Sequence, residues 1–117
     1  MKAKTIQEYA MRAKKSDDEL RASVGEFIDD LKTKNVEKIL IEFEVKDKVD
    51  TLFVAIAHAV VDEFKISAPK WIRITRPLSE PFFLTNLPGS RVLALRDSPF
   101  QFRSRNIFVS VNYISRA

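Results

Sequence analysis

The sequence has no cysteine, which excludes disulfides, thiolate catalysis and zinc sites with cysteine ligands. Glycine occurs only twice in 117 residues, and strand-rich folds need many tight turns that glycine usually supplies. The scarcity of glycine therefore favours helices. Histidine occurs once, at position 58, so a metal site made of histidines and an acid–base pair of two histidines are both impossible.

Long apolar runs are also missing. No run of about 18 apolar residues occurs, as a membrane-spanning helix would need, and the first residues lack the apolar segment of a secretory signal. We therefore expect a soluble, cytoplasmic protein without membrane contact. A chain of 117 residues is expected to build one hydrophobic core, so residues 1–117 are predicted to form a single domain.

Acidic side chains are scarce in the second half of the chain. Residues 1–65 carry 12 Lys or Arg and 14 Asp or Glu, whereas residues 66–117 carry 8 and 2, so the net charges are −2 and +6. Seven of those eight basic residues are arginines, which suit bidentate contacts with carboxylates or phosphates. An acidic protein, a nucleic acid or the chain's own acidic first half could accept such a surface.

Two capping-box patterns predict helix starts in the first half, at residues 5–8 (TIQE) and 16–19 (SDDE). The second pattern opens a predicted helix over about residues 17–33, whose apolar side chains follow one face. Its opposite face is predicted to be a solvated surface and not a site. That face carries Asp18, Arg21, Glu26, Asp29, Asp30 and Lys32.

Residues 36–45 fit both a helical and a strand pattern. A helix is favoured there, because a lone strand needs a partner and the chain offers few. Residues 47–64 predict the central helix of the core, since they are apolar around most of the circumference. His58 lies within that helix and is expected to pack beside the core. The pattern of helical ribonucleases, an arginine four to six residues before a histidine, is absent before His58.

Prolines divide the chain after residue 66. Pro69 is expected to end helical geometry before it, and further prolines leave only short pieces. Ser90 and Ser98 are predicted to cap two short helices. Residues 107–114 have strong β propensity and are expected to add an extended strand or to cross the core as a strap.

These patterns predict an all-α fold, a small helical bundle. Its helical core spans residues 5–64, and a basic segment of short helices, residues 66–117, wraps it and adds at most one extended strand. The large apolar side chains near the end of the chain are expected to clamp the core, leaving the arginines between them to face outward. Those clamping residues are Phe100, Phe102, Ile107 and Phe108.

No group of residues predicts a reaction, because the carboxylates are explained as caps or solvated helix faces. We therefore expect no enzyme, cofactor or metal. Arginines interleaved with aromatic residues instead predict a module that binds an acidic protein partner. A nucleic acid bound by the same surface is the alternative, and inward-facing arginines paired with the acidic first half are a structural alternative. The predicted partner-binding residues are Arg73, Arg76, Arg96, Arg103 and Arg105.

A series of short motifs runs through the second half: residues 68–71 (APKW), 78–83 (LSEPFF), Arg91 with residues 94–95 (AL), 98–109 (SPFQFRSRNIFV) and 115–117 (SRA). Their order resembles the tail of a group of small, uncharacterised bacterial proteins that occur in, or are encoded beside, components resembling toxin–antitoxin systems. The resemblance covers residues 66–117. It implies a partner-binding or neutralising role and identifies no catalytic residue.

Overall fold

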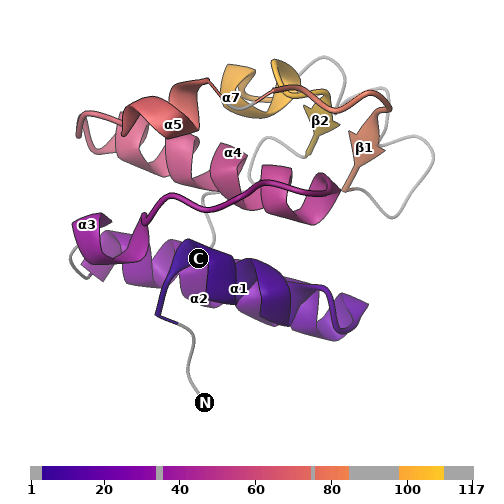
Figure 1. The fold of residues 1–117 in the computed structure, drawn as a ribbon, viewed down its shortest axis with the longest axis horizontal. Coiled ribbons are helices and arrows are strands. Elements are labelled where there is room, and N and C mark those ends of the chain that lie inside the picture. The colour runs from indigo at the N-terminus through magenta and orange to yellow at the C-terminus, as the bar shows by residue number, and fades with distance from the viewer. Residues whose placement is uncertain (1–3, 34–35, 75, 85–97, 110–117) are drawn as a thin grey trace.

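The computed structural model describes residues 4–33, 36–74, 76–84 and 98–109. Figure 1 shows three layers: α1 and α2 form the lower one, α4 lies in the middle, and the short elements of the second half form the upper one. The prediction of a small, mostly helical fold is confirmed. The elements are α1 (Ile6–Ala13), α2 (Asp17–Thr33), α3 (Val36–Ile39), α4 (Lys48–Glu63), α5 (Lys70–Arg73), β1 (Phe82–Phe83), α7 (Phe100–Arg103) and β2 (Ile107–Phe108).

The predicted helix starts are confirmed by their capping bonds. The Thr5 hydroxyl accepts from the Glu8 amide at 3.4 Å, and the Ser16 hydroxyl accepts from the Glu19 amide at 3.1 Å. At the start of α4, Asp47 Oδ1 accepts from the Asp50 amide at 3.0 Å. Each cap satisfies a backbone donor that the first helical turn leaves without a partner.

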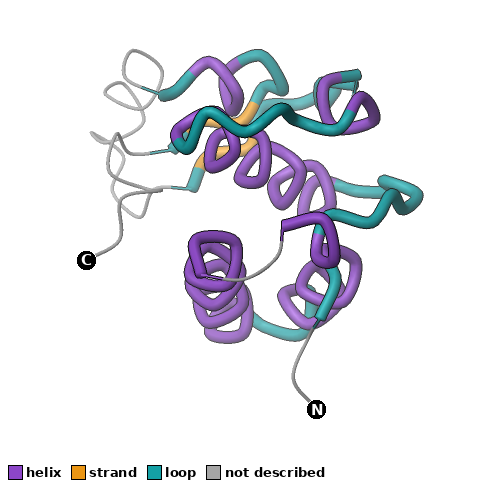
Figure 2. The backbone as a smooth tube through the Cα atoms, turned by 90° about the vertical axis from the view of Figure 1, so that its left-hand side faces the viewer, coloured by secondary structure: helices purple, strands orange, loops and turns teal. Residues whose placement is uncertain are grey.

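The central helix predicted over residues 47–64 is confirmed as α4. α4 packs against α1 and α2 on one side and against α5 and α7 on the other, and in the view of Figure 2 it lies between the lower helix pair and the short upper elements. Between α2 and α4, the ring centroids of Phe27 and Phe53 lie 5.1 Å apart. The Lys14 ammonium joins the end of α1 to the start of α4, since it lies 2.9 Å from carboxylate oxygens of both Asp47 and Asp50.

The outer face of α2 is not wholly solvated. Asp30 is buried and accepts a hydrogen bond from the Tyr9 hydroxyl of α1, so the predicted solvated role is wrong for Asp30. Glu26 is half-buried and pairs with Arg12 Nη1 at 2.6 Å. The cause is that α1 packs across α2 and covers part of the face that periodicity alone assigns to water.

The predicted helix over residues 36–45 is wrong beyond Ile39. One turn, α3, forms at Val36–Ile39, and an irregular segment then leads to α4. Along it Phe43 and Val45 pack against the core, and Phe43 meets Trp71 edge-on at 5.9 Å. The alternation that resembled a strand is present only over residues 42–45, because Leu40 is buried and Ile41 is exposed. This segment belongs to no sheet within the described ranges.

The upper layer holds a two-stranded parallel sheet. Phe82 lies opposite Ile107 and Phe83 opposite Phe108. β2 falls at the start of the predicted extended run, whereas β1 was not predicted. Val109 of that run is described and follows the strand, whereas residues 110–114 and the predicted cap Ser90 lie outside the described residues.

Two predictions about residues 98–109 are wrong. Ser98 does not cap α7, because its hydroxyl donates to Val109 O at 3.0 Å and accepts from Val109 N at 2.9 Å. Phe100 does not clamp the core, because it is 56% exposed. Phe102, Ile107 and Phe108 are buried as predicted.

None of the helices in the described ranges combines the length and apolarity needed to span a lipid bilayer.

Candidate functional site

The structure divides the predicted partner-binding arginines among different environments. Arg73 ends α5, Arg103 ends α7, and both are exposed. Arg76 is exposed on the segment after α5. Arg96 lies outside the described residues. Arg105 is only 3% exposed, so it cannot form part of an outward-facing surface in this fold.

Arg105 instead joins three elements, α5, α7 and α4. Its Nη2 donates to Ile72 O in α5 and its Nη1 donates to Gln101 O in α7, both at 2.6 Å. Asn106 follows with a φ of 65°, a left-handed conformation that asparagine tolerates better than most residues, and its side chain donates to Leu78 O at 3.2 Å. The turn after α7 therefore places the guanidinium between the two short helices.

The third partner of Arg105 is His58 on α4, whose Nδ1 lies 3.2 Å from Arg105 Nη1. Since a guanidinium can only donate, Nδ1 is the acceptor and the imidazole proton resides on Nε2. His58 Nε2 lies 3.4 Å from Asp62 Oδ2, and the same carboxylate oxygen accepts from Gln101 Nε2 at 2.8 Å. The result is a polar network between α4 and α7, which we call the His58 network: His58, Asp62, Gln101 and Arg105.

The electrostatics of the His58 network keep the imidazole uncharged. Burial lowers the pKa of His58, the positive charges of Arg105 and Arg73 lower it further, and the Asp62 carboxylate opposes them. Burial also lowers the pKa of Arg105, but a guanidinium keeps its proton in proteins. Both ring nitrogens of His58 are thus engaged within the network, Nδ1 by Arg105 and Nε2 by Asp62.

Exposed side chains of α5 and α7 lie next to the His58 network. The Phe100 ring stands edge-on to the His58 ring at 5.8 Å, and Arg103 is one helical turn further along α7 on the same face. Arg73 influences His58 electrostatically and directly follows Ile72, which Arg105 ties to α7. Ile74, next to Arg73, is 68% exposed. We call Arg73, Ile74, Phe100 and Arg103 the α5–α7 surface.

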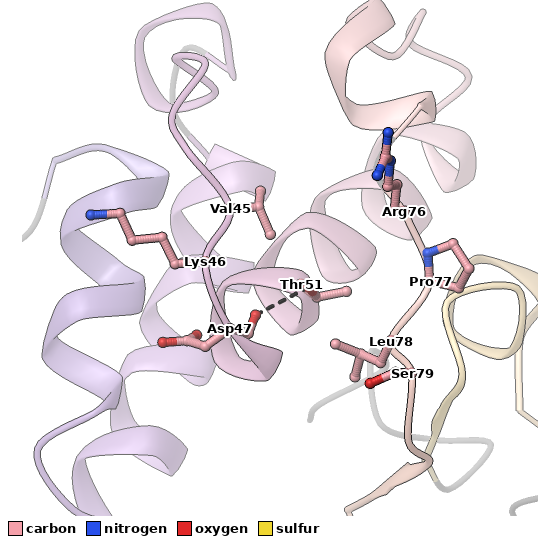
Figure 3. A pocket seen from close by; sticks show the side chains of 8 residues that line it. All are labelled: Val45, Lys46, Asp47, Thr51, Arg76, Pro77, Leu78 and Ser79. Carbon is pink, nitrogen blue, oxygen red and sulfur yellow. Dashed lines mark hydrogen bonds between the residues drawn. The ribbon is translucent and has the colours of Figure 1, made fainter.

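Arg76 belongs to a different region, a groove of about 430 Å³ at the N-terminal end of α4. Figure 3 shows Val45, Thr51 and Leu78 turned toward the space between the two walls of the groove, whereas Lys46 points away from it. The Asp47 carboxylate is already held by Lys14 and by the Asp50 amide. Charged and uncharged side chains both line the groove, and the charged ones are Lys46, Asp47 and Arg76. Arg76 does not join the α5–α7 surface.

Within the described ranges, no three His, Asp or Glu side chains gather in a way that could hold a metal ion. The His58 network was not predicted, because His58 and Arg105 are 47 residues apart and no local pattern connects them. From the sequence, His58 was expected only to pack beside the core, and it does lie there.

The comparisons with known proteins add no relative. No family model matches the chain, and neither a curated protein nor a solved structure matches it. The protein can therefore be described only by its structure. It is a small, mostly helical fold in which exposed aromatic and basic side chains lie beside a largely buried polar network.

Proposed function

We propose that the chain is a protein-binding module that contacts an acidic partner through the α5–α7 surface. The observation that carries the proposal is Phe100, a large aromatic side chain that is 56% exposed at the start of α7, the helix that ends at Arg103. Large side chains on a protein surface are common singly. An exposed aromatic residue flanked by arginines, however, has the composition of an interaction hot spot.

The charges on this surface are available to a partner. In the part of the chain that the structure describes, neither Arg73 nor Arg103 forms an ion pair. The nearby carboxylate of Asp62 already accepts from Gln101 at 2.8 Å. An acidic partner would therefore supply the carboxylates that this surface lacks, and Phe100 and Ile74 would supply apolar area for burial.

The test is capture of partners from host-cell extract with the wild type and the double variant Arg73→Glu/Arg103→Glu. We expect a specific protein to be retained by the wild type and by a control, Lys15→Glu/Lys38→Glu, which changes the net charge equally at exposed positions elsewhere. The same protein should be lost from the surface variant and from Phe100→Ala. Nuclease-sensitive capture that weakens steeply with salt would favour the nucleic-acid alternative.

On the resemblance of residues 66–117 to toxin–antitoxin components, the proposed partner is an acidic toxin-like protein met in the bacterial cytoplasm. The module would then act by occupying the partner's surface and would catalyse no step itself. Co-expression tests this finer proposal. The wild type should relieve growth arrest caused by a toxin encoded beside it, and Arg73→Glu/Arg103→Glu should not.

A further inference from the structure

We propose that protonation of His58 releases α7 and the Arg105 turn from α4, so that the upper layer of the fold loosens as the pH falls through the range in which histidine titrates. The inference starts from one contact. Arg105 Nη1 donates to His58 Nδ1 at 3.2 Å, and this bond exists only while Nδ1 has a free lone pair. A protonated imidazole carries hydrogens on both nitrogens, so it would turn a donor toward a donor.

Protonation would also place two positive charges side by side in a buried site. Arg105 is 3% exposed and the His58 side chain 13% exposed. Arg105 cannot relieve the repulsion by losing its own proton. In surroundings of low dielectric, like charges at this separation repel strongly, so the contact has to open when His58 gains a proton.

The groups around His58 come from every element packed against it. Arg105 approaches from the turn after α7, Arg73 from α5, and Asp62 from α4 itself, where its Oδ2 lies 3.4 Å from Nε2. Asp62 alone favours the imidazolium, and it shares that oxygen with Gln101. Burial and the two arginines outweigh it, and the pKa of His58 is lowered.

The release is confined to the upper layer, because Arg105 connects α5 and α7 to α4. Its guanidinium makes the bonds to Ile72 O and Gln101 O that join α5 to α7, and its Nε has no hydrogen-bond partner in the described structure. Losing the bond to His58 therefore weakens the attachment of α5 and α7 to α4 through Arg105. The titratable residues that act on His58 come from the upper layer and α4, and none comes from α1 or α2.

The linkage between protonation of His58 and opening of α7 gives the size of the pH dependence. His58 in the open state titrates at its ordinary pKa, whereas the closed state excludes the proton. Between the two pKa values, the equilibrium constant for opening α7 rises by up to about tenfold for each unit of pH decrease. Opening also displaces Phe100 and Arg103. This consequence for binding rests on the proposed function, whereas the release itself does not.

The experiment uses the chain alone. Because His58 is the single histidine, its NMR titration is unambiguous and should give a pKa below the ordinary value of about 6.5. Amide exchange is followed from pH 7.5 to 5.5 and corrected for its intrinsic pH dependence. Protection of the amides of Ser104 and Arg105, which bond to Phe100 O and Phe102 O, should fall by up to about tenfold per pH unit. Protection in α2 should stay constant.

Three variants sharpen the test. His58→Asn places a non-titrating acceptor where Nδ1 lies, and the pH dependence at α7 should disappear. Asp62→Asn should lower the pKa of His58 in the closed state further, and Arg73→Gln should raise it, so the pH at which opening stops increasing should move in opposite directions in the two variants. Equal loss of protection in α2 and α7, an unchanged slope in His58→Asn, or shifts in the same direction for the other two variants would overturn the proposal. None of these readouts depends on a partner.

Discussion

Arg105 donates to the backbone carbonyl of Ile72 at 2.6 Å across 33 positions of sequence, and so ties α7 to α5. A charged side chain thus acts as an internal connection in the basic half of the chain. The same residue was predicted to face a partner. Arg105 therefore holds the upper layer together, whereas Arg73, Arg76 and Arg103 are exposed.

Replacing Arg105 with alanine should destabilise the fold by about 2–4 kcal/mol, because its side-chain hydrogen bonds are lost and buried carbonyls are left without donors. Arg103→Ala, two residues earlier at the end of α7, provides the matched control. It should change the free energy of unfolding by less than about 0.5 kcal/mol, since Arg103 is exposed. Urea denaturation measures both. Equal effects of the two substitutions would mean that Arg105 does not connect the elements as described.

Phe100 and Phe102 form a second matched pair on α7. Phe102→Ala should cost about 3–5 kcal/mol, because Phe102 is fully buried and its removal leaves a cavity. Phe100→Ala should cost less than about 1 kcal/mol while weakening partner capture. Thermal unfolding and capture, measured on both variants, separate the two roles. A strong loss of stability in Phe100→Ala would assign that ring to the core.

Asp47 is expected to stabilise α4 mainly through its capping bond to the Asp50 amide, at 3.0 Å. Asp47→Ala should cost about 1–2 kcal/mol, whereas Asp47→Asn keeps an acceptor and should cost less. Burial acts to raise the pKa of Asp47, but the Asp50 amide and Lys14 outweigh it, and the pKa is lowered. The stability from ionised Asp47 is therefore present above its ordinary pKa and is lost as the pH falls through the lowered one. Acid unfolding of Asp47→Asn should lack this component.

Tyr9 should make the fold sensitive to alkali. Burial and the hydrogen bond to Asp30 raise the pKa of Tyr9 above its ordinary value. Because the folded state resists ionisation, the stability is fully present below pH of about 10 and is lost as the pH rises further. Tyr9→Phe should flatten the decline of the free energy of unfolding between about pH 9.5 and 11. A decline that persists unchanged in Tyr9→Phe would assign it to another group.

The sequence predicted those parts of the fold that depend on local physics. Capping side chains at Thr5, Ser16 and Asp47 and the apolar surface of α4 determine where the long helices lie. Residues 36–45 escaped prediction because their conformation depends on packing against Trp71, which comes from a distant segment. The local pattern predicted that Ser98 caps α7. Its hydroxyl bonds instead to the backbone of Val109, which offers both a donor and an acceptor.

The candidate site was predicted only in part, for a similar reason. Arginine content indicated a binding surface, and Arg73 and Arg103 are exposed as that interpretation requires. Whether a particular arginine faces outward depends on the turn that precedes or follows it, and the left-handed Asn106 turns Arg105 inward. The exposed Phe100 was predicted to be core, because sequence alone does not distinguish the two phenylalanines of α7.

Binding of the captured partner to Arg73→Glu/Arg103→Glu, measured by titration calorimetry beside wild type and Lys15→Glu/Lys38→Glu, tests the central claim most directly. The proposed surface predicts a loss of affinity of about thirtyfold or more in the first variant, since one hot-spot residue contributes about 2 kcal/mol, and near wild-type affinity in the second. Unchanged affinity in Arg73→Glu/Arg103→Glu, or an equal loss in both variants, would contradict the assignment of binding to the α5–α7 surface.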